Sequence, residues 1–583
     1  MEIESASHMF EYTFCPSTFK SDPDATPAST HICRLARTPC FKMKVRTSTS
    51  REQSVNYEWD EKDCSTKHNI KSWERRLHIL NEKRRCLLPI RNPSPQLFDA
   101  VLIVSLRNVI LYGVAIWGPY VSQMADGVKC SANECYRNIK PVVTYRFPEE
   151  TVKDSISPEF FFPDFTHDQS KMFLKEEFVI VLTNDKGARS NAYCAKFLSL
   201  LDDGDSSDSI NPSVLVVISS NRNDVFYLNL VSVIKKHAEK SQEHLTCFLS
   251  SIAKNDYPQK RGASLVVVER YPACIPNRTE IVNNGTALGR SSSSKIIERI
   301  SPEITACVIA ALLAERRILL VDHSVCTASE MVHVMEALIQ PLIWPYVFIP
   351  VIPDTLSDLT QNPTPYLMGI LRKNIVHIRD LIVSEQCTLN DIDPEHFIFI
   401  DSQSGLLNPL PHPCPATGVT SSWKQHCALH FCERMGMPKK AAMALITGFR
   451  DALVDGSGTA ADIKVENVML LWYASIFGHY TLTARQCEWG SSSFNKRLVE
   501  MQPDKMIRPY LSYLCETVMF QEWIMNRLSK QGVSTDPLPG TVEYQSGRID
   551  KLYSAGVNCF TAKPSTKVLK RVANILKSTE KGQ

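Results

Sequence analysis

The sequence has almost no net charge and no long apolar run, and these two absences exclude large classes of protein. Its 65 basic and 62 acidic residues leave a formal charge of +3, which argues against a protein that neutralises many nucleic-acid phosphates. The most apolar segment, residues 97–120, is interrupted by Asp99, Arg107 and Asn108. Its uninterrupted part has about half of the ~20 residues that a membrane-spanning helix needs. We therefore expect a buried strand at 100–106 and then an irregular insertion.

Motifs for covalent and nucleotide chemistry are also missing. The sequence has no G-x-x-x-x-G-K-[ST] phosphate loop, no H-E-x-x-H helix, no G-x-S-x-G elbow and no set of kinase signatures. Its 19 cysteines include no C-x-x-C pair, and we see no secretory signal, so we expect reduced thiols in a cytosolic protein.

One cluster of potential metal ligands remains to be weighed. It consists of His412, Cys414, His426, Cys427, His430 and Cys432. Zinc sites favour a tighter paired spacing than this, and the start of a helix after a proline-rich linker explains the cluster equally well. We therefore predict no metal and no cofactor.

Composition and periodicity divide the chain into segments. Residues 1–70 are rich in Ser, Thr, Pro, Asp and His without a sustained period, which is typical of disorder. We expect a disordered leader (1–70), a basic helix or linker (71–96), a first α/β lobe (97–255) with an insertion (109–138), a second α/β lobe (264–411), a helical part (421–530) and a tail (531–583).

Two basic amphipathic stretches, 71–88 and 567–577, flank the expected lobes. In each, apolar residues fall near one helical face and Lys and Arg surround them. A solvated surface helix explains this pattern. Peripheral contact with an anionic membrane explains it too, because ~1 kcal/mol is available there for each nearby basic residue. The sequence leaves both interpretations open.

The first lobe is predicted to contain strands followed by a helix. An apolar hairpin extends from Phe178 to Phe197 with its turn at 184–187, and an apolar strand follows at 214–218. Asn223 or Asp224 can then cap a helix whose apolar residues recur on one face. Strands followed by a helix suit a small α/β layer.

The second lobe begins with a well-marked helix and a buried strand. Ser301-Pro302-Glu303 supplies a capping hydroxyl, a first-turn proline and a carboxylate at the positive end of a helix. The strand at 318–321 is apolar at every position, so we expect it to be covered on both faces. A helix at 329–339 and a strand at 346–349 follow, which gives a βαβ crossover. A later strand ends at Asp401.

The residue identities in the segment 314–371 are more informative about the protein family than the apolar periodicity is. This segment resembles the central part of a DENN domain. That pattern has ERR before an apolar strand, a Trp before an apolar run that ends in IPV-x-P, and then P-x-P-x-L-x-G. The matching residues are Glu315, Arg316, Arg317, Trp344, Pro350, Pro353, Pro363, Pro365 and Gly369. Residues 160–164 and 476–480 resemble the upstream and downstream DENN segments, closest to the subgroup called DENN domain-containing protein 2.

This resemblance implies a fold. It implies a longin-like α/β lobe, a second α/β lobe with a mainly parallel central sheet and an all-α subdomain. We expect the matching motif residues to hold that fold, so that their mutation destabilises the protein before it inactivates it.

The resemblance also implies guanine-nucleotide exchange on a Rab small GTPase, without covalent chemistry and without a cofactor. The expected partner is a GDP-bound or nucleotide-free Rab, in vesicle trafficking at the periphery of endosomal or Golgi membranes. Loop residues at strand ends are the expected GTPase contacts: Asn221, Arg222, Asp224, Asp322, His323 and Asp354. Two alternatives stay open, a GTPase-activating subunit that uses Arg222 as an arginine finger and a binding scaffold without activity.

Overall fold

A computed structural model describes residues 96–560, 571–572 and 574–575, apart from internal gaps. The gaps are 109–110, 113–114, 117–138, 150–155, 165–175, 184–187, 201–209, 259–262, 270–276, 284–292, 379–396, 404–406, 409–420, 455–458, 488–491 and 530–541. The predicted leader, the stretch 71–88, most of the insertion and the turn at 184–187 lie outside the described residues. Within them, no helix is both long and apolar enough to cross a membrane.

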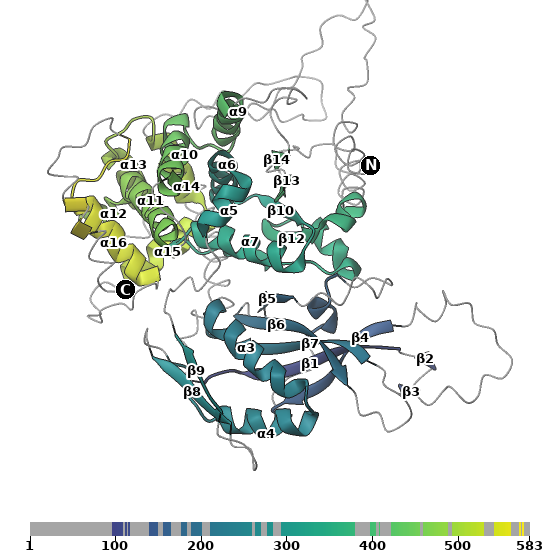
Figure 1. Cartoon of the computed structure of the whole chain (residues 1–583). Helices are drawn as coiled ribbons and strands as arrows, with labels where there is room; N and C mark the ends of the chain where they lie inside the picture. Colours follow the sequence, from purple (N-terminus) through teal and green to yellow (C-terminus); the bar gives the residue numbers. More distant parts are fainter. Residues whose placement is uncertain are drawn as a thin grey trace, which may run out of the picture. The chain divides into compact units, whose positions relative to one another are not determined.

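The first lobe is built on a five-stranded sheet in the order β4-β1-β7-β6-β5 (Figure 1). All neighbouring strands are antiparallel, and β5 and β6 form the predicted hairpin with Thr183 opposite Arg189. The strands are β1 (Ala100–Asn108), β4 (Ile139–Phe147), β5 (Glu177–Thr183), β6 (Arg189–Leu200) and β7 (Ile210–Ser219). Shorter pieces are β2 (Leu111–Tyr112), β3 (Ala115–Ile116) and the turn η3 (Pro158–Phe161).

Two helices, α3 (Asp224–Ala238) and α4 (Gln242–Ile252), cover one face of this sheet. Asn223 caps α3 because its side chain accepts a hydrogen bond from the backbone N–H of Phe226, which confirms the predicted start. Beneath α3, the rings of Tyr193 and Tyr227 stack with their centroids 4.5 Å apart. Aromatic packing thus holds the helix to β6 of the sheet.

A hairpin of β8 (Ser264–Glu269) and β9 (Asn277–Val282) also belongs to the first lobe. Leu265, Val267 and Ile281 are buried in the cluster that lies between the sheet and α3. The sequence places the start of the second lobe near residue 264. The packing of these three side chains instead makes the hairpin an extension of the first lobe.

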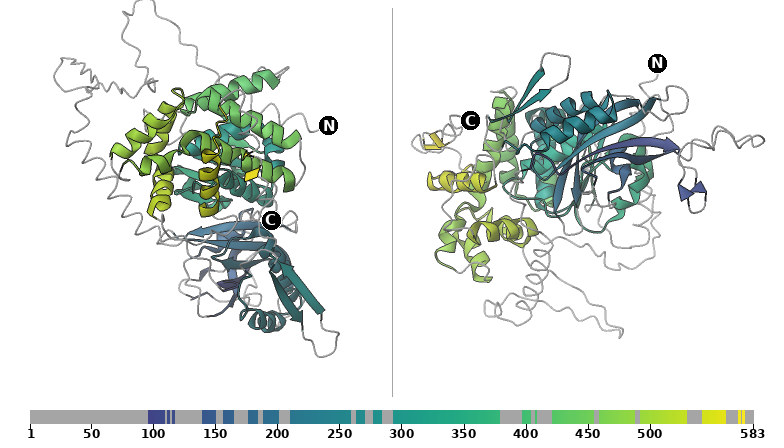
Figure 2. Two further views of the ribbon diagram at one scale, coloured as in Figure 1. Left: turned by 90° about the vertical axis from the view of Figure 1, so that its left-hand side faces the viewer. Right: turned by 90° about the horizontal axis from the view of Figure 1, so that it is seen from below.

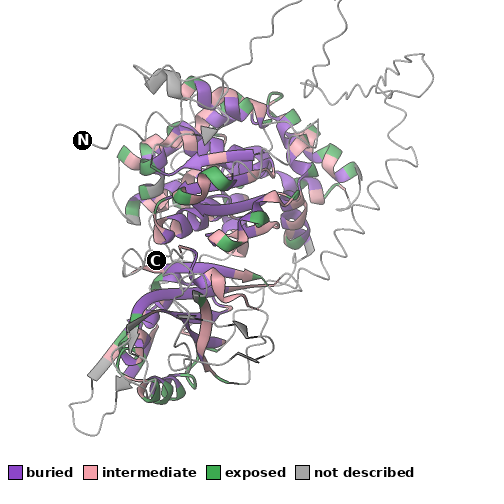
Figure 3. Cartoon of the chain, turned by 90° about the vertical axis from the view of Figure 1, so that its right-hand side faces the viewer, coloured by how far each residue is buried: buried purple, intermediate pink, exposed green. Residues whose placement is uncertain are grey.

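The second lobe contains a sheet in the order β11-β12-β10-β13-β14, in which the first four strands are parallel and β14 is antiparallel. This confirms the predicted mainly parallel sheet. Residues 318–321 are at most 1% exposed, as expected for a strand covered on both faces. Figure 3 draws buried residues in purple. The strands are β10 (Arg317–Asp322), β11 (Val347–Ile349), β12 (Tyr366–Leu371), β13 (Phe397–Asp401) and β14 (Leu407–Asn408).

Helices cover one face of the second sheet, and short 3-10 turns cover the other. The helices are α5 (Ser293–Ile300), α6 (Pro302–Leu313) and α7 (Val325–Leu338); the turns are η5 (Asp354–Gln361) and η6 (Arg372–Asn374). Ser301 caps α6 by accepting from the N–H of Ile304, as predicted. All of residues 305–313 are buried, because α6 packs against α9 and α10 and also touches α5 and α7.

The start of α7 corrects a prediction. The sequence suggests that the helix begins at Ser329, but it begins at Val325, and Ser324 caps it by accepting from the N–H of Thr327. Ser329 lies one turn inside the helix and is buried. Its hydroxyl is hydrogen-bonded to Val179 of the first lobe.

The remainder of the described chain is helical, as predicted. Gly478 follows α11, and a Cβ there would lie 2.5 Å from the carbonyl oxygen of Ala474 and 2.8 Å from Cβ of Tyr553, so no larger residue fits. The helices are α9 (Ser421–Arg434), α10 (Lys439–Val454), α11 (Thr459–Phe477), α12 (Tyr480–Ala484), α13 (Ser492–Met501), α14 (Arg508–Glu516), α15 (Val518–Ser529) and α16 (Val542–Ser554), and Figure 2 shows them in two further views.

Candidate functional site

An ionic cluster joins the two α/β lobes. Arg222, in the loop between β7 and α3, donates from Nη1 to Oε2 of Glu336 at 2.8 Å. Arg189, at the start of β6, reaches the other oxygen of the same carboxylate, with Nη1 3.5 Å from Oε1. Glu336 lies in α7 of the second lobe, and its side chain is 7% exposed. One buried carboxylate therefore holds two arginines that come from different segments of the first lobe.

Arg189 fixes a second feature of the second lobe. Its Nη2 donates to the backbone carbonyls of Trp344 and Tyr346, at 2.9 Å and 2.7 Å. Its guanidinium also lies 5.4 Å from the ring centroid of Phe348, within the range of a cation–π contact. Arg189 thus holds the segment that leads into β11 as well as α7.

The charge states in this cluster follow from burial and from close partners. Burial alone would raise the pKa of Glu336, but the positive charges of Arg222 and Arg189 outweigh it and hold that pKa below its ordinary value. Burial raises the pKa of Asp224 to about 6, although Arg222 opposes the shift. Burial lowers the pKa of His333 to about 3, and Arg222 adds to this effect. At neutral pH, two cations thus face two carboxylates beside a neutral imidazole.

Two further contacts connect the lobes along α7. The hydroxyl of Ser329 donates to the carbonyl of Val179 at 2.6 Å and accepts from the N–H of the same residue at 3.3 Å. Nearer the start of the helix, the Ser324 hydroxyl donates to Glu176 at 2.9 Å, and Glu176 is held by the buried Lys196 at 2.8 Å. The first lobe therefore touches α7 near its start, at its middle and near its end.

The predicted contact residues of the first lobe lie in the loop between β7 and α3 and at the first residue of α3. Asn221 is buried, and its side-chain amide donates to the carbonyl of Gln96 at 3.1 Å. Arg222 and Asp224, the first residue of α3, belong to the ionic cluster. The structure thus brings these three predicted residues together at the start of α3, and it gives each of them an internal contact. Their predicted role in binding a GTPase remains a prediction.

The predicted contact residues of the second lobe are more dispersed. Asp322 is buried at the end of β10, where it accepts from Arg299 at 3.1 Å and from the N–H of Ser324 at 2.9 Å. His323 beside it is exposed. Asp354 is half-buried at the start of η5 and pairs with Lys373 at 2.5 Å. Of these three, His323 presents the most open side chain.

Another strand end is closed in a similar way. Asp401, at the end of β13, is buried and pairs with Arg372. Ser402 follows it and hydrogen-bonds to Asp322. These internal pairs occupy the carboxyl ends of β10 and β13, where an open parallel sheet often binds a ligand.

Sequence reasoning missed Glu336 and Arg189, which are central to the cluster. A weak signal was present, because Glu336 is the one acidic residue in the run from Met331 to Ile339, in which His333 is the only other polar residue. A carboxylate at such a position needs a buried cationic partner. Nothing local in the sequence identifies that partner, which lies 114 residues away for Arg222 and 147 for Arg189.

The ERR motif lies where the second lobe meets the helical part. Glu315 has a positive φ of 53°, and its carboxylate accepts from the hydroxyl of Tyr346 at 2.8 Å and from the N–H of Met519 at 3.0 Å. Arg316 is half-buried. The guanidinium of Arg317 lies 3.7 Å from the ring centroid of Phe397.

The remaining motif residues shape β11, β12 and their connection. Trp344 is fully buried, and its indole N–H donates to the carbonyl of Val347 at 3.1 Å. Gly369 lies against Pro350, whose carbonyl oxygen would be 2.1 Å from a Cβ at this position. The prolines differ in burial: Pro353, which directly precedes η5, is buried, Pro365 is half-buried and Pro363 is exposed.

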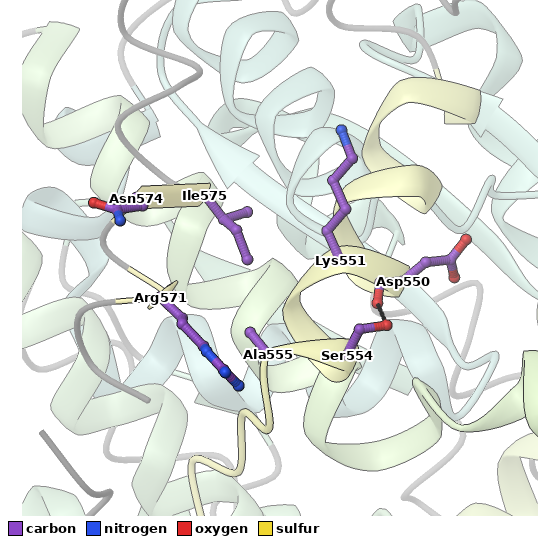
Figure 4. A pocket seen from close by; sticks show the side chains of 7 residues that line it. All are labelled: Asp550, Lys551, Ser554, Ala555, Arg571, Asn574 and Ile575. Atoms are coloured by element: carbon purple, nitrogen blue, oxygen red, sulfur yellow. Dashed lines mark hydrogen bonds between the residues drawn. The ribbon is translucent and has the colours of Figure 1, made fainter. Parts of the chain in front are cut away.

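No metal site is found in the described part of the chain. Its His, Cys, Asp and Glu residues form no group of three that could hold a metal ion; His412 and Cys414 lie outside it. A cavity of about 500 Å³ lies between the end of α16 and the residues Arg571, Asn574 and Ile575 (Figure 4). Its lining mixes the cations Lys551 and Arg571 with Asp550, which is paired with Arg527 at 2.6 Å.

The C-terminal stretch 567–577 is described at four residues only. Among these, Val572 and Ile575 pack against the main hydrophobic core. Contact of this stretch with a membrane remains a prediction.

Comparisons with known proteins give a consistent result. Residues 210–395 match the family model described as DENN (AEX-3) domain, a span that extends from β7 into the second lobe. DENN domain-containing protein 2C of Homo sapiens is 24% identical over 447 residues, which cover 75% of this chain and 43% of the relative. DENN domain-containing protein 2A of Homo sapiens is 24% identical over 506 residues, which cover 83% of this chain and 46% of the relative.

A third relative extends the match. DENN domain-containing protein 2B of Homo sapiens is 24% identical over 533 residues, which cover 88% of this chain and 42% of the relative. The chain thus spans less than half the length of these three relatives. Together with the fold, these findings confirm the resemblance drawn from the sequence: residues 210–395 match the DENN domain, and the chain is similar to the proteins named DENN domain-containing protein 2.

Proposed function

We propose that this chain is a guanine-nucleotide exchange factor that promotes release of GDP from a Rab small GTPase in membrane trafficking. The match of residues 210–395 to the DENN domain carries the proposal. The matched span includes the loop between β7 and α3 as well as the ERR motif and α7. It therefore contains the ionic cluster through Arg222 and Glu336, although Arg189 precedes it.

Exchange requires differential affinity and no covalent step. An exchange factor binds the nucleotide-free GTPase more tightly than the GDP-bound form, and this difference in binding free energy lowers the barrier to GDP release. The segments of a small GTPase that bound nucleotide and Mg²⁺ keep ordered are the natural target. A firmly joined pair of lobes suits this task, because a rigid surface can hold those segments away from their nucleotide-bound arrangement.

The loop at 221–224 and the exposed His323 are the positions at which we propose GTPase contact. The stem of Arg222 contributes to the accessible surface, since its side chain is 28% exposed although its guanidinium faces Glu336. Val225 follows this loop and is 40% exposed, which adds apolar area for a partner to cover. Polar groups beside an exposed apolar residue are common in protein interfaces.

The arrangement of Arg222 favours exchange over GTPase activation. An arginine finger must extend its guanidinium into the active site of the GTPase. In this protein, Nε and Nη2 of Arg222 are buried and Nη1 is bound to Glu336. Use as a finger would require that this buried ion pair be broken, which is strongly unfavourable.

The proposal includes the partner state and the location. The GTPase would bind in its GDP-bound or nucleotide-free form, and the protein would act in the cytoplasm at the periphery of endosomal or Golgi membranes. The basic stretches 71–88 and 567–577 would then supply contact with anionic lipid.

Two parallel assays on the full chain test the proposal. The chain is mixed with a panel of Rab proteins, and release of fluorescent GDP and release of phosphate from GTP are followed separately. Faster GDP release from at least one Rab is the expected result. Faster phosphate release that is lost in Arg222→Ala would instead establish GTPase activation. Binding without either effect would establish a scaffold.

A further inference from the structure

Helix α7 is a main point of contact between the two α/β lobes, beside the hydrogen bonds of Arg189 to the carbonyls of Trp344 and Tyr346. Three polar contacts along α7 connect it to the first lobe, through Ser324, Ser329 and Glu336. The first two contacts bind the β5–β6 hairpin or the segment just before it. Glu336 differs from them, because it also binds the loop between β7 and α3. It therefore connects α7 to two separate segments of the first lobe.

Burial makes the carboxylate of Glu336 difficult to replace. The side chain is 7% exposed, and the two guanidiniums that it binds are 27% and 28% exposed. If the charge of Glu336 were removed, Arg189 and Arg222 would remain as two neighbouring cations, with Asp224 acting on Arg222 and Glu522 acting on Arg189 as remaining negative charges. Like charges at short range in a partly dry environment repel strongly. The two arginines would therefore separate, and each would take its own segment with it.

We propose that Glu336 is a positioning residue. It fixes the loop at 221–224 and the β5–β6 hairpin relative to α7, and so determines the shape of the surface that binds the GTPase during GDP release. This inference rests on the proposed exchange function. It assigns Glu336 no contact with the GTPase. Its effect on exchange passes through the placement of Arg222 and Arg189.

Glu336→Gln tests this role, and Glu303→Gln is its matched control. Glu303 is also a buried carboxylate that binds an arginine, with Nε of Arg450 3.1 Å from Oε1, but it joins α6 to α10 and not the two α/β lobes. At equal folded fractions, Glu336→Gln should lower kcat/KM for GDP release about tenfold, which lies within the usual range of coupling between sites. Glu303→Gln should lower it less than twofold.

Hydrogen–deuterium exchange of backbone amides provides a readout that does not depend on GDP release from the GTPase. In Glu336→Gln, deuterium uptake should rise in α7, in β5 and in the loop at 221–224, whereas uptake in α9 and α10 should stay at the wild-type level. Should Glu336→Gln fail to fold, Arg189→Lys gives the same test, because lysine keeps the charge but cannot reach the carboxylate and two carbonyls together.

Each outcome has a defined meaning. Equal losses of kcat/KM in the Glu336 and Glu303 variants would overturn the positioning role, as would unchanged deuterium uptake across the lobe junction. A wild-type chain that releases GDP from no Rab would refute the proposed function. In that case the uptake data would still decide whether Glu336 fixes the junction.

Discussion

Replacement of Gly369 by alanine is the sharpest test of the idea that the DENN motif residues hold the fold. Gly369 lies in β12, next to the chain that leaves β11. A Cβ at this position would be 2.1 Å from the carbonyl oxygen of Pro350 and 3.3 Å from Cγ2 of Val332. The first distance involves backbone, which cannot turn aside as a side chain can. The chain around Pro350 must therefore move away from β12.

The size of the effect follows from two contributions. Insertion of an extra carbon into a packed core costs about 1–3 kcal/mol. The displacement would also weaken the hydrogen bond from the N–H of Ile352 to the carbonyl of Gly369, now 2.8 Å long, and such a bond contributes about 1 kcal/mol. We expect Gly369→Ala to lower the free energy of unfolding by about 2–4 kcal/mol. Folded Gly369→Ala should retain exchange activity.

Urea unfolding followed by tryptophan fluorescence measures this change, because Trp344 is fully buried in the same lobe. Gly547→Ala is the control. Gly547 lies inside α16, where a Cβ would meet nothing within 4 Å, so this substitution should raise stability by up to about 1 kcal/mol. Wild-type stability in Gly369→Ala would refute the reasoning, and so would loss of exchange activity in a variant of unchanged stability.

Three further predictions concern polar groups that are buried or half-buried. The folded-state pKa of Asp224 is raised from 3.8 to about 6, so the contribution of Asp224 to stability should fall as pH rises from about 4 to about 6; the difference in urea midpoint between wild type and Asp224→Asn should follow this contribution across that range. The pKa of His333 is lowered from 6.5 to about 3, so the contribution of His333 should fall as pH decreases from about 6.5 to about 3; the difference in urea midpoint between wild type and His333→Gln should follow that opposite trend. Glu315→Ala should lower the thermal midpoint by removing the acceptor of two hydrogen bonds, worth about 2–3 kcal/mol in total; a thermal midpoint equal to that of wild type would contradict its role at the junction with α15.

Local signals in the sequence were sufficient for most elements of the fold. The cap of α3 at Asn223 was predictable because an amide side chain before a periodic apolar run is a strong start signal. The buried strand β10 was predictable because apolar residues at every position require cover on both faces. The start of α7 was not, since Ser324 and Ser329 are both acceptable caps in sequence and only tertiary contact with Val179 distinguishes them.

The candidate site was less accessible to sequence reasoning. The loop that contains Arg222 was predictable as a strand-end loop, but the direction of its guanidinium was not. That direction depends on Glu336, which is distant in sequence and has no motif of its own. The same holds for Asp322. Its position at the end of a strand predicts an accessible carboxylate, but in the structure this carboxylate accepts hydrogen bonds from Arg299 and Ser402. Long-range ion pairs decide which polar residues remain available to a partner.

The contact between Ser329 and Val179 has a consequence for the solution behaviour of the first lobe. β5 is the last strand of its sheet, and the hydroxyl of Ser329 takes up both backbone groups of Val179 on the open side of that strand. An uncovered strand edge pairs readily with other chains. A fragment that ends before α7 would expose this edge and should aggregate. In the whole chain, we therefore expect α7 to prevent self-association through β5.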